Sequence, residues 1–192
     1  LSTAPGRVCL FGDHQDYLEL PVIACAIDRM MEIYAEENGK DHLEINMPDM
    51  NQKRIIPLQE DFNEIERGDF LKIALKVLQK RNIVPNKGYS LTISSKIPIN
   101  AGLSSSSALT ISWIQFLIAA FSERSTSPKE LALLAYETEV IESGSSGGKM
   151  DQFTIAIGDT IFLDTHTDQV QKFNDLKLDL VVGVSGLSKD TF

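Results

Sequence analysis

This chain of 192 residues has few cysteines, no long apolar run and no excess of positive charge. It has no apolar run of the roughly 18 residues that a membrane span needs, and residues 1–7 lack the apolar centre of a signal peptide. Only Cys9 and Cys25 could form a disulfide or bind a metal; both lie in apolar runs, and we expect buried thiols. Lys and Arg number 18 against 27 Asp and Glu, for a formal net charge of −9, which argues against nucleic acid as a partner. These absences favour a cytoplasmic protein that binds small molecules.

Apolar patterning predicts an α+β fold, and the length suits one domain. Helices are expected where apolar residues recur at helical spacing or form a long buried run, at residues 70–78, 109–121 and 127–141. The last of these begins with Ser127, Pro128 and Glu130, which form a capping-box start. Strands are predicted at residues 8–11, 21–27, 31–35, 43–47, 54–58, 89–97, 161–163 and 178–184. The first third therefore indicates a mixed or antiparallel sheet.

One turn carries the most information about chemistry. Gly102, Leu103 and Ser104 are followed by three more serines, Ser105, Ser106 and Ser107, and then by the apolar helix. A helix start presents unpaired N–H groups and the positive end of the helix dipole, which together suit a phosphate group. No Gly-Lys-Ser/Thr follows the glycine, so this is not a Walker A loop. The turn is predicted to hold nucleotide phosphates; a polar loop that merely caps a helix is the alternative.

Acidic residues elsewhere in the chain could complete a phosphoryl-transfer site around this turn. Such a site needs bound phosphates, Mg²⁺ on hard oxygen ligands, and a carboxylate near the acceptor hydroxyl. Glu139 could bind the metal, and Asp151 lies in the segment 147–152. Taken singly, Asp151, His14 and the pair Asp13 and Asp16 have simpler interpretations as surface acids, a structural histidine and a solvated turn. His42 and His166 are expected at the surface.

The joint pattern resembles galactokinase, a member of the superfamily that also contains homoserine, mevalonate and phosphomevalonate kinases (GHMP kinases). The resemblance rests on residues 7–17 (RVCLFGDHQDY), 98–106 (PINAGLSSS) and 150–153 (MDQF), in that order. It implies a domain like domain 2 of ribosomal protein S5, with ATP as cosubstrate and Mg²⁺ as cofactor. It also implies that residues 1–192 form the N-terminal domain of a longer kinase, because the family's third, glycine-rich motif is absent from them.

The resemblance also implies a role for each matched residue. Asp151 corresponds to the catalytic aspartate, and Arg7 faces it across the sugar C1 hydroxyl. Ser106 and Glu139 correspond to the Mg²⁺ ligands. Sugar hydroxyls would be bound by Asp13, His14 and Asp16, with Tyr17 beside them, and ATP phosphates by Gly102, Leu103, Ser104, Ser105, Ser106 and Ser107.

Departures from the galactokinase pattern leave the acceptor open. Asp13 replaces the usual Glu, and Lys149 precedes Met150, where it could point to solvent or bind an anionic substituent. The residues after Tyr17 lack the usual Gly-Gly and resemble mevalonate kinase, although Arg7 and Asp16 do not. We expect a sugar phosphorylated at its anomeric hydroxyl, galactose or a relative. The alternatives are a mevalonate-like kinase, a catalytically silent sugar- or nucleotide-binding regulator, and an S5-like RNA-associated domain, which the acidic charge disfavours.

Overall fold

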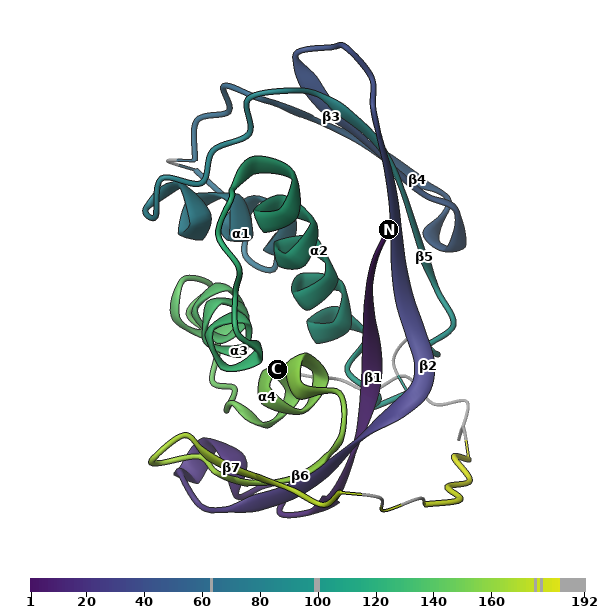
Figure 1. Cartoon of the computed structure of the whole chain (residues 1–192), viewed down its shortest axis with the longest axis vertical. Coiled ribbons are helices and arrows are strands. Elements are labelled where there is room, and N and C mark those ends of the chain that lie inside the picture. Colours follow the sequence, from purple (N-terminus) through teal and green to yellow (C-terminus); the bar gives the residue numbers. More distant parts are fainter. Residues whose placement is uncertain (63, 99–100, 175, 177, 184–192) are drawn as a thin grey trace.

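The chain folds into two layers, a mixed sheet covered on one face by helices (Figure 1). The computed structural model describes residues 1–62, 64–98, 101–174, 176 and 178–183. Ile99 and Asn100 of the second motif lie outside this part. The α+β prediction and the mixed sheet are confirmed. Among the described residues, no helix combines the length and apolarity that a membrane crossing requires.

Strand β2 organises the sheet. It pairs antiparallel with β1, β5 and β6, whereas β3 and β5 run parallel. The sheet order is β4-β3-β5-β2-β6-β7, and β1 pairs with β2 off this path. The strands are β1 (Ser2–Phe11), β2 (Val22–Glu37), β3 (His42–Met47), β4 (Gln52–Pro57), β5 (Tyr89–Ser95), β6 (Thr160–Asp164) and β7 (Gln169–Lys172).

Two strand predictions need correction. The two strands predicted at residues 21–27 and 31–35 form one long strand that begins at Val22, because the intervening Asp28 and Arg29 are exposed residues within β2 and do not form a turn. Residues 178–183 form no strand, since they pair with no edge of the sheet and their apolar side chains remain exposed, Val181 at 98%. Val184, the end of that predicted strand, lies outside the described residues. Cys25 is buried as expected, but Cys9 is only half-buried.

The α-helices of the described chain pack on one face of the sheet (Figure 1). They are α1 (Phe70–Gln79), α2 (Ser105–Phe121), α3 (Pro128–Tyr136) and α4 (Met150–Ile157). Helix α2 is apolar around most of its circumference and is the core helix. The predicted cap of α3 is confirmed, because Ser127 Oγ accepts from the Glu130 N–H at 3.2 Å. Past Tyr136 this helix continues as one π-helical turn, η3 (Glu137–Ile141).

Helix α4 was not predicted, and it places the candidate site. It contacts β1, β2, α2 and α3, and Met150 and Phe153 anchor it in a second apolar cluster with Val22 and Ile161. The starts of α2 and α4 thereby meet beside β1 (Figure 1). Residues that are far apart in the sequence converge at this junction.

Candidate functional site

The start of α2 presents its N–H groups without a side-chain cap. Gly102 and Ser104 adopt the left-handed conformation, with φ of 72° and 54°, and the helix begins at Ser105. Ser104 stands at the N-cap, yet its hydroxyl makes no capping bond and donates instead to Asp151. A serine at a helix start ordinarily satisfies one of these N–H groups. Diverting the Ser104 hydroxyl leaves them available to an anion at the positive end of the helix dipole.

Arg7 joins Asp151 to this turn. Arg7 Nε donates to Asp151 Oδ1 at 2.6 Å, and Arg7 Nη1 donates to the Gly102 carbonyl oxygen at 2.6 Å. The Arg7 backbone N–H also donates to the Leu103 carbonyl oxygen at 3.1 Å. The side chains of Arg7 and Asp151 are 10% and 26% exposed, so the carboxylate remains accessible from one side. The structure thus brings the two predicted catalytic residues together at the predicted phosphate turn.

Glu139 is buried on the π-helical turn η3, a distortion that occurs frequently at functional sites. Its carboxylate accepts from Ser107 Oγ at 2.8 Å, Thr110 Oγ1 at 2.9 Å and Gln152 Nε2 at 2.5 Å. Burial raises the pKa of Glu139 to about 7; these hydrogen bonds act in the opposite direction, and the charge of Asp151 adds to the rise. Sequence reasoning missed Thr110 and Gln152. The spacing of Ser107 and Thr110, three residues apart on one helix face, was the available signal.

The structure brings Ser107, not Ser106, to Glu139. Ser107 is buried, whereas Ser106 is exposed and lines an apolar groove of about 270 Å³. The groove runs from Ser105 and Ser106 to the side chains of Met31, Met47, Met50, Ile93 and Leu109. An apolar groove beside an uncapped helix start suits a nucleobase whose phosphates reach that helix.

The oxygen atoms around Glu139 fit Mg²⁺. This ion takes hard oxygen ligands and usually combines one or two carboxylates with substrate phosphates and water. The described part of the chain has no group of three or more His, Cys, Asp or Glu side chains that could hold a metal, so phosphates would have to complete the ion's coordination. Within the described chain the buried Oε1 atom of Gln152 has no hydrogen-bond partner, while Nε2 of the same side chain donates to Glu139.

The residues predicted to bind the acceptor divide into two groups. Asp13, His14 and Tyr17 are exposed, and Tyr17 Oη lies 3.5 Å from His14 Nδ1. Asp16 is buried and accepts from the backbone N–H groups of residues 149 and 150. The structure therefore leaves three of the four side chains open to a ligand.

Lys149 is engaged within the protein. Its Nζ donates to Asp168 Oδ1 at 2.6 Å and to the Thr165 carbonyl oxygen at 3.2 Å. This ion pair ties the start of α4 to the turn between β6 and β7. The ammonium group neither points freely to solvent nor stands open to an anionic ligand.

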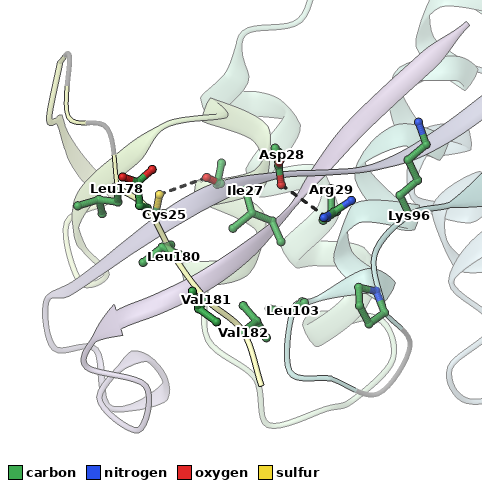
Figure 2. A pocket seen from close by; sticks show the side chains of 13 residues that line it. Cys25, Ile27, Asp28, Arg29, Lys96, Leu103, Leu178, Leu180, Val181 and Val182 are labelled. Atoms are coloured by element: carbon green, nitrogen blue, oxygen red, sulfur yellow. Dashed lines mark hydrogen bonds and ion pairs between the residues drawn. The ribbon is translucent and has the colours of Figure 1, made fainter. Parts of the chain in front are cut away.

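A larger cavity of about 660 Å³ lies elsewhere, between β2 and residues 178–182 (Figure 2). Arg29 and Asp28 form an ion pair at 3.7 Å beside it, and Lys96 lies on the same side as Arg29, away from Leu178 (Figure 2). Leu103 is the only predicted site residue that lines it, so size does not identify the candidate site.

We predict that metal-free protein loses stability as pH rises, through Glu139. Its pKa is about 7 folded and ordinarily 4.5, so the folded state binds more protons between these values and stability falls as pH rises through them. Glu139→Gln removes this loss, worth on the order of 3 kcal/mol. Thermal unfolding in the presence of a chelator should show the Tm of Glu139→Gln rising relative to that of wild type as the pH increases from 5 to 8. The same dependence of Tm on pH in both proteins would contradict the prediction, and so would an equal relative rise in the control Glu36→Gln, which alters an exposed residue.

Two family models match the stretches of the chain that form this site. Residues 69–159 match the GHMP kinases N terminal domain, and residues 1–36 match the galactokinase galactose-binding signature. A mevalonate kinase of Thermococcus sibiricus is 31% identical over 199 residues, covering 100% of this chain and 59% of that protein. A galactokinase of Thermotoga neapolitana is 35% identical over 170 residues, covering 85% of this chain and 46% of that protein.

The fold agrees with these matches. The crystal structure of the Methanococcus jannaschii mevalonate kinase superposes with a TM-score of 0.76 at 28% identity, covering 90% of this chain and 55% of that one. The chain therefore spans about half to three-fifths of the length of these relatives. Sequence signatures, relatives and fold agree that this chain belongs to the GHMP kinase family, with the family's N-terminal domain and the galactokinase galactose-binding signature.

Proposed function

We propose that this chain supplies the nucleotide- and acceptor-binding half of an ATP-dependent kinase that phosphorylates the anomeric hydroxyl of galactose or a related sugar. One observation carries the proposal: the carboxylate of Asp151 is bound to Ser104, the N-cap residue of an otherwise uncapped helix of 17 residues. Phosphates held at that helix start would lie beside the carboxylate. An acceptor hydroxyl between the two would be positioned for phosphoryl transfer.

The side chains divide the work of such a transfer. The backbone N–H groups at the start of α2 would hold phosphate oxygens, and the Met-lined groove would hold the base. Asp151 would orient the acceptor hydroxyl and receive its proton, while Arg7 fixes the position of the carboxylate. Glu139 and the hydroxyl of Ser107 would face Mg²⁺, which when bound neutralises charge on the phosphates.

Two features support a neutral sugar over an anionic acceptor such as mevalonate. The galactose-binding signature matches residues 1–36, which contain the exposed Asp13, His14 and Tyr17. Carboxylate, imidazole and phenol groups are suited to hydrogen bonds with hydroxyls. The cations of Arg7 and Lys149 are already bound to Asp151 and Asp168, so neither is free to neutralise a substrate carboxylate. A kinase that phosphorylates mevalonate or a similar alcohol is the second candidate, because the chain is also similar to mevalonate kinases.

The acceptor is tested first. The complete protein, incubated with ATP and Mg²⁺, should phosphorylate galactose or another aldose in a screen of hexoses, pentoses, uronic acids and mevalonate. Phosphorus and carbon NMR of the product should place the new phosphate on the anomeric oxygen. Activity with mevalonate alone, or phosphate on a primary hydroxyl, would favour the second candidate. Binding of sugar or nucleotide without turnover would indicate a regulator.

The second test concerns Asp151. Asp151→Asn in the complete protein should lower kcat by about 10² or more, because a carboxylate that accepts a proton acts mainly in the transition state. The nucleotide Kd should change little. Asp28→Asn, which alters an acid whose side chain is 90% exposed, is the control and should leave kcat unchanged. Wild-type turnover by Asp151→Asn would remove this residue from the mechanism.

A third test separates two adjacent serines. Ser107→Ala removes a hydroxyl that donates to Glu139, whereas Ser106→Ala alters an exposed residue in the groove. The Mg²⁺ concentration for half-maximal activity should rise about tenfold in Ser107→Ala, the lower end of the loss seen when partners of metal ligands are removed. It should change less in Ser106→Ala. The opposite order would support Ser106 as the ligand, as the resemblance implied.

A further inference from the structure

We propose that Asp16 is a positioning residue that anchors the start of α4 and thereby holds Asp151 in place. Asp16 belongs to a short 3-10 turn, η1 (Asp16–Leu18), that follows β1. Its Oδ1 accepts from the N–H groups of Lys149 and Met150 at 2.8 and 3.1 Å, and its Oδ2 lies 3.1 Å from the Met150 nitrogen. A residue 133 positions away therefore serves as the cap.

Helix α4 needs this distant acceptor because its own N-cap offers none. The N-cap residue is Lys149, whose side chain makes no capping bond. The helix has 8 residues, little more than two turns, so an uncapped first turn would weaken a large part of it. Asp151 is the second residue of that first turn. Loss of the anchor would displace the carboxylate directly.

The fit between Asp16 and the chain is close at Gly148. A Cβ atom added to Gly148 would lie 2.1 Å from Asp16 Cγ and 2.3 Å from each carboxylate oxygen. Asp16 itself is 8% exposed. A buried carboxylate packed on backbone and bound to two N–H groups has little room for a substrate hydroxyl. Asp13, His14 and Tyr17 remain as the exposed groups of this segment.

Two anchors from one end of the chain then hold α4. Arg7, on β1, binds the Asp151 side chain, and Asp16, just after β1, binds the helix backbone. The catalytic consequence rests on the proposed role of Asp151; the anchor itself does not. Thermal stability tests the anchor, and turnover tests its consequence.

The test combines substitutions on both sides of the contact. Asp16→Ala and Gly148→Ala should each lower the Tm of the complete protein by about 4–10 °C. The double variant should lose little more Tm than Asp16→Ala alone, well short of the sum of the two single losses, because removing the carboxylate makes room for the added Cβ. Asp16→Asn keeps an oxygen acceptor and should stay near wild type. Gly147→Ala lies in the same loop, but its added Cβ would meet a Val140 methyl at 3.2 Å and would not touch Asp16; it is the matched control and should lower Tm less than Gly148→Ala.

Kinetics separates positioning from substrate binding. With the best acceptor found, Asp16→Ala should lower kcat about tenfold or more, while the acceptor KM changes less than about threefold. An unchanged Tm with a tenfold rise in acceptor KM would overturn the proposal and make Asp16 a substrate ligand. Additive Tm losses in the double variant would also overturn it. If no acceptor is phosphorylated, the Tm comparison still decides whether the anchor exists.

Discussion

The contact between Arg7 and Asp151 is the interaction on which the site depends. It joins β1, near the beginning of the chain, to α4, 144 residues later, and the same guanidinium holds the Gly102 carbonyl oxygen. Charge-assisted hydrogen bonds in a partly buried setting are strong and directional. Removing either partner would leave the other charge poorly solvated. Arg7 therefore fixes the distance between the carboxylate and the phosphate turn.

The two helices whose starts meet at this contact differ in how their first N–H groups are bonded. The start of α4 is anchored by Asp16, which accepts from its first two N–H groups, those of Lys149 and Met150. The start of α2 has no side-chain cap, because Ser104 donates its hydroxyl to Asp151. One helix end is thus fixed and the other is left open to an anion. Gln152, next to Asp151, donates to Glu139 and so connects the residue proposed to act on the acceptor with the residue proposed to hold Mg²⁺.

Local patterns explain what could be predicted from the sequence. The core helix and the Ser127 cap follow from residues close together in the chain, and the resemblance placed Arg7 opposite Asp151, which it contacts directly. The resemblance assigned Ser106 to Mg²⁺, and four consecutive serines give no local signal that Ser107 is the one that contacts Glu139. Helix α4 was missed because it is short and its cap is distant in sequence. The engagement of Lys149 depends on Asp168, which no local pattern connects to it.

A crystal structure of the complete protein with Mg²⁺ and a non-hydrolysable ATP analogue would show whether the start of α2 binds the phosphates. We expect the triphosphate to accept hydrogen bonds from the first N–H groups of α2, with the terminal phosphate on the side of Asp151. We also expect the base in the groove lined by Met31, Met47 and Met50. A triphosphate bound away from the start of α2, or turned away from Asp151, would show that this helix start is not the phosphate site.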